Sequence, residues 1–311
     1  MSDLLLSPES LREPMQESFS DEANPLGLDG VEFVEYATSK PQALGHVLEM
    51  MGFRPVARHR SREVLLYRQG GLNIVVNAHP GEGAEAGAGS EVPTISAVAV
   101  RVRDARSAYR HVLERGGWEV PTHPEAMELN IPAIHGAGGS RIYFVDRYKD
   151  FSIWDVDFVP IPSVDPRPPA IAGIHFFGIV QYIGPGRTPD WLEFYEELFG
   201  ITAIPDEQRF GIMPAGTLLR APALRPENRF MLQVIEPEAD SLDTRERLQR
   251  IGLGVPDVLA AVRALKARGI EFVETEATHT GQRGALTKTY LGNVVFELVH
   301  SEPPAAAKAR K

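Results

Sequence analysis

A single pattern recurs four times along this 311-residue chain, and this recurrence constrains the fold more than any other feature of the sequence. Each copy begins with a strand-like stretch of largely apolar residues and continues with apolar residues at helical spacing. It ends with two or three further strand-like stretches. The four leading strands are predicted at residues 31–37, 94–102, 173–183 and 247–255. Such recurrence is typical of folds built from repeated supersecondary modules.

The repeated unit determines the architecture that we expect. One unit leaves a face of its sheet exposed, whereas two units side by side can curl their strands into an open barrel around a cavity. We therefore expect an α+β fold of four modules, paired into two open β-barrel domains. The predicted parts are an N-terminal arm (1–24), an N-terminal domain (25–160), a linker with four prolines (161–172), a C-terminal domain with the candidate active site (173–303) and a tail (304–311).

Each copy is predicted to contain one helix, and glycines follow the apolar periodicity where most of these helices should end. Asp104 and Thr188 are predicted as N-caps, because each precedes a helical pattern and carries a side-chain oxygen. Residues 151–159 alternate in a way that predicts a strand. The four helices are predicted at 41–53, 104–117, 188–200 and 256–269.

Charge and residue counts exclude several classes of function. The net charge is −10, and a surface of this sign repels nucleic acid and anionic membranes, so we expect neither as a partner. The absence of cysteine excludes disulfides, thiolate nucleophiles and Cys-ligated zinc, so a metal site has to use His and carboxylate side chains. No apolar stretch is long enough to span a membrane and no secretory signal pattern is present, so a cytoplasmic location is expected.

The modules resemble the βαβββ unit of the vicinal oxygen chelate superfamily, and longer stretches resemble one family within it. Residues 29–77, which begin DGVEFVEYA, and 127–148, MELNIPAIHGAGGSRIYFVDRY, are similar to the N-terminal domain of bacterial 4-hydroxyphenylpyruvate dioxygenases. In the second half, GIHFFGIV, WLEFYEELFG, RLQRIGLGVPDV and GNVVFELV are similar to the C-terminal domain of that family. The stretch from Phe272 to Gly292 is shorter than in the dioxygenases, so the resemblance implies a shortened C-terminal domain.

The resemblance implies Fe(II) as cofactor, an aromatic 2-oxo acid as the molecule bound, and assembly as a homo-oligomer. In that family two His and one Glu hold the iron and leave three positions open for the substrate and O₂. His175 in GIHFF matches the first ligand, and Glu297 in VVFELV matches the third. The second ligand should be a His after Gln249, and Arg250 stands there instead. A guanidinium has no free lone pair for a metal.

Three interpretations of Arg250 are open from the sequence alone. In the first, Arg250 replaces the metal, pairs with Glu297 and holds the carboxylate or enolate of a ligand. In the second, another group completes a metal site. This group is either His279, in the shortened loop, or Gln233, which matches a substrate-binding amide of the dioxygenases. In the third, Arg250 points out of the barrel.

Three functions are also open from the sequence. The first is a dioxygenase-like protein that oxygenates an aromatic 2-oxo acid at Fe(II), with weak or absent turnover if Arg250 faces into the barrel. The second is a metal-free binding protein for an aromatic or 2-oxo acid, with Arg250 as its anion anchor. The third is a different vicinal oxygen chelate enzyme that catalyses isomerisation or lyase chemistry. Bound metal separates the first from the second, and product analysis separates the first from the third.

Overall fold

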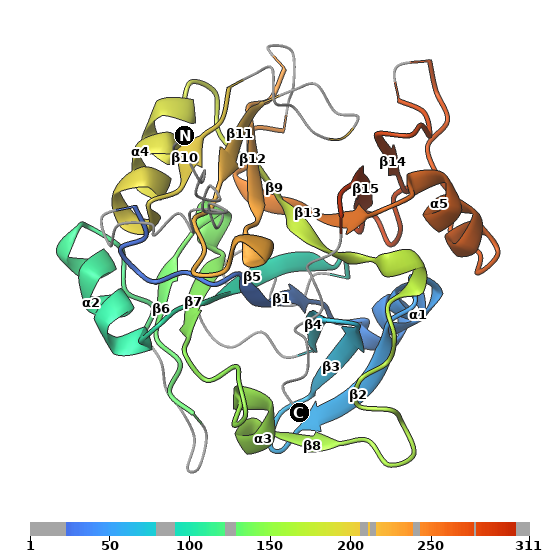
Figure 1. The fold of residues 1–311 in the computed structure, drawn as a ribbon, viewed down its shortest axis with the longest axis horizontal. Helices are drawn as coiled ribbons and strands as arrows, with labels where there is room; N and C mark the ends of the chain where they lie inside the picture. Colours follow the sequence, from blue (N-terminus) through green and yellow to red (C-terminus); the bar gives the residue numbers. More distant parts are fainter. Residues whose placement is uncertain are drawn as a thin grey trace, which may run out of the picture.

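The fold is a single mixed sheet with short helices at its periphery (Figure 1). The predicted α+β class is therefore confirmed. The predicted tail (304–311) and residues 1–22 of the predicted arm lie outside the described residues. The computed structural model describes residues 23–78, 91–121, 129–205, 211, 216–238, 243–276 and 278–302.

The N-terminal half carries the first eight strands and three helices. The strands are β1 (Val31–Ala37), β2 (Arg54–His59), β3 (Val64–Gln69), β4 (Leu72–Asn77), β5 (Thr94–Arg101), β6 (Ala133–His135), β7 (Arg141–Val145) and β8 (Phe158–Pro160). The helices are α1 (Pro41–Met50), α2 (Ala105–Glu114) and α3 (Ile153–Asp157).

The C-terminal half repeats the order of strand, helix and strands twice. Its strands are β9 (His175–Tyr182), β10 (Thr202–Ala203), β11 (Thr217–Arg220), β12 (Met231–Ile235), β13 (Arg247–Val255), β14 (Gly284–Leu286) and β15 (Phe296–His300). Its helices are α4 (Thr188–Phe199) and α5 (Val258–Lys266).

Strand pairing shows the internal repeat directly. The first strand of each copy pairs in parallel with a later strand of the same copy, which joins β1 to β4, β5 to β7, β9 to β12 and β13 to β15. The two leading strands of each half pair antiparallel, β1 with β5 and β9 with β13. The fourfold repeat predicted from the sequence is thus confirmed. The curling of each half into an open barrel, and the domain boundaries, stay predictions.

The two halves are joined at a seam between their central strands. Leu248 of β13 pairs with Ile95 of β5, so that one sheet runs through both halves. Helices α2 and α4 lie together beside this sheet, and α1 and α5 lie together elsewhere at its periphery (Figure 1). Arg268, just after α5, donates from Nε to the carbonyl of Met50 at 3.0 Å and caps the end of α1.

Strand β13 shows how the sheet separates the core from the site. Ile251 and Leu253 are at most 1% exposed and belong to the main apolar core. Arg250, Gly252 and Gly254 alternate with them and therefore face the other side of the sheet. On this second face, β13 carries one charged residue and two glycines. A pocket can form over the glycines, because they have no side chains.

Two local predictions were wrong. Residues 153–157 form helix α3 instead of the predicted strand, and only 158–160 are extended as β8. The cause is a capping box, in which Ser152 and Asp155 each bond the backbone of the other and start a helix. Thr188 is the first helical residue, not the N-cap, which is Arg187. Asp104 is the N-cap of α2 as predicted, and it accepts from the Ser107 amide at 2.7 Å.

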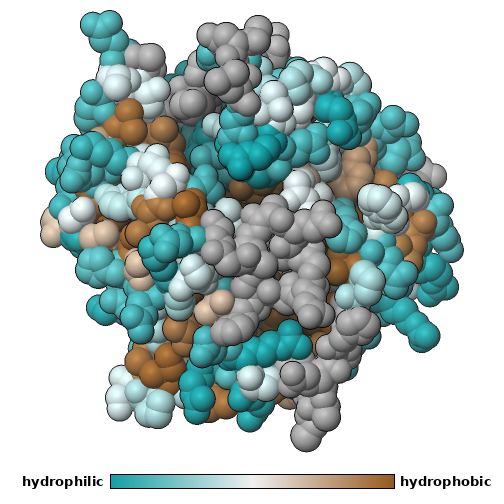
Figure 2. Space-filling view, turned by 180° about the vertical axis from the view of Figure 1, so that it is seen from behind, coloured by the Kyte–Doolittle hydropathy of each residue, from teal (hydrophilic) through white to brown (hydrophobic). Residues whose placement is uncertain are grey.

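On the face shown in Figure 2, hydrophilic residues cover much of the described surface, and apolar side chains show in separate areas between them. Among the described residues the most exposed large apolar side chains are Trp118 (79%) and Phe151 (58%). No helix in the described part of the chain is long and apolar enough to cross a membrane.

Candidate functional site

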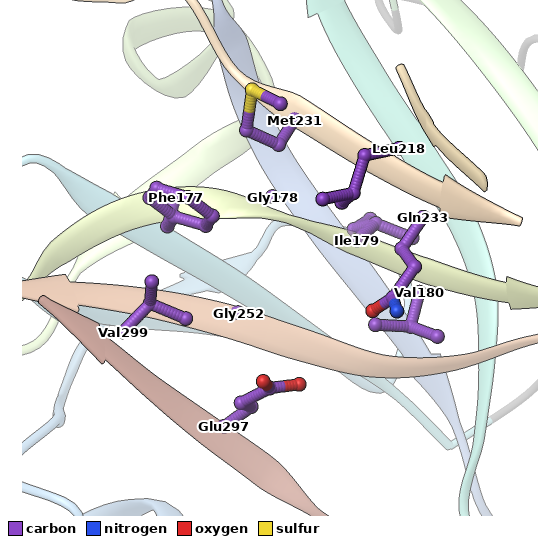
Figure 3. A pocket seen from close by; sticks show the side chains of 10 residues that line it. All are labelled: Phe177, Gly178, Ile179, Val180, Leu218, Met231, Gln233, Gly252, Glu297 and Val299. Carbon is purple, nitrogen blue, oxygen red and sulfur yellow. The ribbon is translucent and has the colours of Figure 1, made fainter. Parts of the chain in front are cut away.

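The candidate site is a pocket on the second face of the C-terminal half (Figure 3). The pocket is open to solvent, and the space in it together with the solvent at its mouth is about 320 Å³. Strands β9, β11, β12, β13 and β15 supply its lining, which is apolar or glycine except for Gln233 and Glu297. The polar ends of these two side chains point toward the same space (Figure 3). A mostly apolar cleft with a few polar groups is the usual form of a small-molecule site.

Strand register places the pocket residues in rows across the sheet. Met231 of β12 pairs with Gly178 of β9, Gly178 pairs with Gly252 of β13, and Gly252 pairs with Glu297 of β15. Directly paired residues face the same side of a sheet, so this row runs along the floor of the pocket. Gly252 leaves space beside the Glu297 side chain, since an added Cβ there meets its nearest atoms only at 3.5 Å, whereas the Met231 carbonyl packs directly against Gly178.

A second row brings Arg250 to the same face. Leu218 pairs with Gln233, Gln233 with Val180, and Val180 with Arg250. The pairing of β13 with β9 is irregular between Leu248 and Arg250, where β13 carries one extra residue. Such a bulge changes which face the following side chains point to. It allows Leu248 to stay in the core while Arg250 points to the pocket side.

Arg250 and Glu297 form a buried ion pair. The Nε of Arg250 lies 3.0 Å from Oε2 of Glu297, and the two residues are 2% and 4% exposed. The predicted pairing of these two residues is therefore confirmed, and the interpretation in which Arg250 points outward is wrong. Removing one partner of a buried pair leaves an uncompensated charge, at a cost of about 3–5 kcal/mol.

One nitrogen of the Arg250 guanidinium has no hydrogen-bond partner in the described structure. Nη1 donates to Oε1 of Gln249 at 3.1 Å, whereas the buried Nη2 has no hydrogen-bond partner among the residues that the structure describes. A buried donor without a partner costs about 1–3 kcal/mol. Ligands with an acceptor oxygen would remove this cost, so Nη2 marks a position for an anion.

His175 opens β9 and has protein partners on both ring nitrogens. Nδ1 lies 3.0 Å from the Gly173 carbonyl oxygen, and Nε2 lies 3.2 Å from Oγ of Ser301. The ring covers Gly254, where an added Cβ would come within 2.2 Å of Nε2. Burial lowers the pKa of His175 and favours the neutral ring, in which one nitrogen donates and the other accepts. His175 is thus held beside the end of β15 and does not line the pocket.

The two other residues predicted for the site lie in different places. Gln233 is 8% exposed on β12 and lines the pocket, as expected for a group that contacts a ligand. His279 is exposed, in the loop before β14, and is not among the pocket residues. The structure therefore places Gln233 and Glu297 in the lining of the pocket, with Arg250 paired to Glu297, and leaves His175 and His279 outside the lining.

The residues present do not fit the three-ligand iron site of the family. The resemblance puts Arg250 where the second ligand is expected, and the Arg250 guanidinium holds the Glu297 carboxylate, which the resemblance matches to the third ligand. Both nitrogens of His175 are already bonded within the protein. In the described part of the chain, no three His, Asp or Glu side chains come together where they could hold a metal ion.

Sequence reasoning missed two contributors to the site. The glycines at 252 and 254 alternate with Arg250 in RIGLGV, and this alternation was the available signal for an open floor. The bond between His175 and Ser301 joins residues that are far apart in the chain, and no local pattern indicates it.

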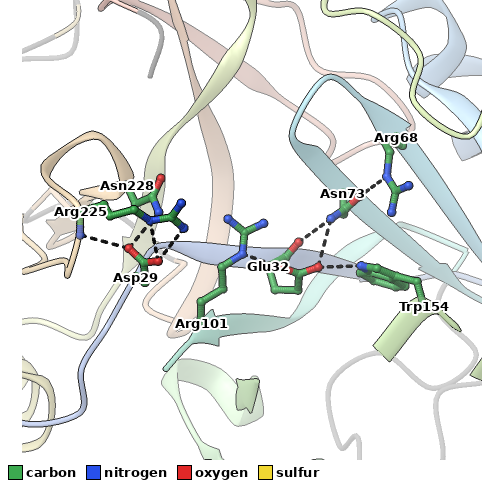
Figure 4. Close-up of polar contacts among 8 residues, drawn as sticks. All are labelled: Asp29, Glu32, Arg68, Asn73, Arg101, Trp154, Arg225 and Asn228. Carbon is green, nitrogen blue, oxygen red and sulfur yellow. Dashed lines mark hydrogen bonds and ion pairs between the residues drawn. The ribbon is translucent and has the colours of Figure 1, made fainter. Parts of the chain in front are cut away.

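A second polar network lies in the N-terminal half and reaches the other half (Figure 4). Glu32 is buried and accepts from Nε of Arg101 at 2.5 Å and from Nε1 of Trp154 at 2.6 Å. Asp29, also buried, accepts from Nη2 of Arg225 at 2.6 Å. Because these buried carboxylates are paired, we interpret them as structural and not as a ligand site, with the Asp29–Arg225 pair as a link between the halves.

Comparisons with known proteins agree with the architecture. Residues 22–159 match the family model described as hydroxyphenylpyruvate dioxygenase, HPPD, N-terminal, and residues 174–296 match that of the glyoxalase/bleomycin resistance protein/dioxygenase superfamily. The chain is 36% identical over 273 residues to hemolysin VllY of Vibrio vulnificus, covering 83% of this chain and 76% of the relative. It is 33% identical over 273 residues to 4-hydroxyphenylpyruvate dioxygenase of Pseudomonas aeruginosa, covering 83% and 75%.

A solved structure shows the same fold. It is a mutant of 4-hydroxymandelate synthase from Streptomyces coelicolor, which superposes with a TM-score of 0.67 at 16% identity. The superposition covers 90% of this chain and 94% of that one.

Proposed function

Because the chain belongs to the 4-hydroxyphenylpyruvate dioxygenase family, we propose that its C-terminal pocket binds an aromatic 2-oxo acid, and that Arg250 supplies the positive charge that iron supplies elsewhere in the family. The observation that carries the proposal is the buried Nη2 of Arg250, which has no partner in the described structure. It lies on a guanidinium that Glu297 already fixes through Nε.

The charged end of the pocket suits a carboxylate. Hydrogen bonds between guanidinium and carboxylate are among the strongest in proteins, and the planar donor arrangement favours planar anions. Gln233 supplies an amide in the same space, and an amide N–H can bond the 2-oxo oxygen of the ligand.

The other end of the pocket suits an aromatic ring. Phe177, Leu218 and Met231 give an apolar surface, with the glycine floor at 178 and 252 between them and the charged pair. Aromatic rings bury a large apolar area, and Met sulfur makes favourable contacts with them. A ligand with a carboxylate at one end and a ring at the other matches both parts.

A second candidate function is iron-dependent oxygenation of the same ligand. It is supported by the resemblance, which matches His175 and Glu297 to two iron ligands; the two residues lie on the strands that flank β13. This function requires the Arg250–Glu297 ion pair to separate and a third side chain to coordinate the iron. The two candidates therefore differ in whether the protein binds its ligand without metal.

Titration calorimetry with 4-hydroxyphenylpyruvate, in the presence of a metal chelator, tests the proposal. We expect saturable binding by the full chain and a loss of about 10- to 150-fold in affinity for Arg250→Met, because a charged hydrogen bond contributes about 1.5–3 kcal/mol. Arg247→Met is the matched control, since Arg247 lies on the same strand but pairs with Asp243 near the surface. Binding that appears only after anaerobic loading with Fe(II) would support the second candidate instead.

A further inference from the structure

We propose, on the basis of the proposed function, that the pocket also has an activity: metal-free proton exchange at C3 of the bound aromatic 2-oxo acid, with Glu297 as the general base. This activity needs a carboxylate that faces the ligand, a cation that stays beside it and a donor for the developing oxyanion. Glu297 and Gln233 line the pocket, and Arg250 is held next to it through its bond to Glu297.

Glu297 has the position that a base requires. It is the one carboxylate among the described residues that line the pocket, and it is 4% exposed. Its Oε2 accepts from Arg250, which leaves Oε1 for proton transfer. Gly211 lies against Oε1, and an added Cβ there would come within 2.5 Å of this oxygen. Because residue 211 is a glycine, it places no side chain beside Oε1 of Glu297.

The charges favour transfer of a proton to Glu297 once the ligand is bound. A ligand carboxylate held by Nη2 brings a second negative charge close to Glu297, and a nearby like charge favours the protonated form of a carboxyl group. Arg250 stays paired with an anion before and after the transfer. The net charge of the occupied pocket therefore does not change during the step, which avoids the cost of creating a buried charge.

The step itself is a balanced proton transfer. The C3–H bond of the ligand breaks, and its proton forms an O–H bond with Oε1 of Glu297. The electron pair forms the C2=C3 double bond, and the C2=O electrons become an oxyanion that accepts from the Gln233 amide and from Arg250. The protonated Glu297 exchanges its proton with solvent before it reprotonates C3, which gives exchange at C3, or a proton is passed to the oxyanion, which gives the enol. No oxidant, reductant or metal is consumed.

Proton NMR in D₂O measures this activity as loss of the C3–H signal of phenylpyruvate or 4-hydroxyphenylpyruvate, with chelator present. We expect the full chain to accelerate exchange over buffer, and Glu297→Gln to lower the rate by about 10²- to 10⁴-fold, the usual contribution of a general base. Binding measured by calorimetry should change only a few-fold in this variant. Glu271→Gln is the matched control, because Glu271 is an exposed carboxylate that also pairs with a cation, Lys288.

The outcomes separate the two proposals. Binding without accelerated exchange, or equal exchange by wild type and Glu297→Gln, overturns the activity and leaves the proposed function intact. No binding by wild type overturns both. If Glu297→Gln does not fold, Glu297→Asp keeps the charge but withdraws the oxygen by one methylene, and a drop in exchange rate with retained binding supports the proposal. A rate that stays the same in this variant refutes it.

Discussion

The Arg250–Glu297 pair allows a sharp prediction about stability. Arg250→Met removes the guanidinium and leaves Glu297, 4% exposed, as a buried carboxylate without its cation. The loss in unfolding free energy should be about 3–5 kcal/mol, the usual cost of breaking a buried pair. Glu297→Leu should cost a similar amount, because it leaves a buried guanidinium unpaired. These losses are a large part of the 5–15 kcal/mol that stabilises a typical domain.

The double variant makes the prediction specific. Arg250→Met with Glu297→Leu replaces two buried charges by apolar side chains, which is often neutral or stabilising by about 1–4 kcal/mol. The two single losses should therefore far exceed the loss in the double variant. Urea unfolding followed by tryptophan fluorescence measures all three, since Trp191 is 7% exposed in the C-terminal half and reports on it.

An exposed ion pair provides the control for this cycle. Lys288 and Glu271 are 59% and 65% exposed at their side chains, so Lys288→Met should cost less than about 1 kcal/mol. If Arg250→Met costs no more than Lys288→Met, the guanidinium is not buried against Glu297 and the reasoning about the pocket fails.

Three further predictions concern metal, pocket volume and pH. Arg250→His places an imidazole where the family's second iron ligand is expected, so the iron content after anaerobic Fe(II) loading should rise toward one per chain, as measured by mass spectrometry. The control variant Arg247→His should keep the iron content of the wild type. Gly252→Val should lower the affinity for 4-hydroxyphenylpyruvate at least about 10-fold in calorimetry, because its side chain would fill the space that the ligand ring occupies. Its stability should change little, because an added Cβ meets its nearest atoms only at 3.5 Å. Unchanged affinity would mean that the ring does not lie over Gly252. Burial raises the pKa of Glu35 above its usual 4.5, so the folded state binds this proton more tightly than the unfolded state and loses stability as pH rises from 4.5 through the folded-state pKa. Glu35→Gln should therefore raise the urea midpoint at pH 8 relative to wild type more than at pH 4, and an equal change at both would contradict this.

The sequence was sufficient to predict the repeat and the leading strands, because strand alternation and glycine-terminated helices are local signals. It offered Glu297 as the partner of Arg250 only in the interpretation in which Arg250 replaces the metal. Helix α3 was missed because its capping box of Ser152 and Asp155 lies inside a stretch that also alternates like a strand. A short segment of this kind has two local interpretations, and only tertiary packing decides between them.

The direction of Arg250 and the partners of His175 could not be predicted. The face to which Arg250 points depends on one extra residue in β13, and alternation counted from Leu248 would place it in the core. His175 bonds Ser301, which reaches it only because β13 lies between β9 and β15. Both features depend on strand pairing across long sequence separations, which single-residue patterns do not encode.

The seam between the halves has a consequence for how this chain can be divided. Strand β13 pairs with β5 through Leu248 and Ile95, and the Asp29–Arg225 ion pair crosses the same boundary. A polypeptide cut in the proline-containing linker would keep every strand of the pocket in one fragment, because β9, β11, β12, β13 and β15 all follow the linker. It would separate Asp29, whose side chain is 3% exposed, from its cation Arg225. The two pieces are thus suited to a split-protein reporter, in which reassociation restores the Asp29–Arg225 pair and the contact between β5 and β13.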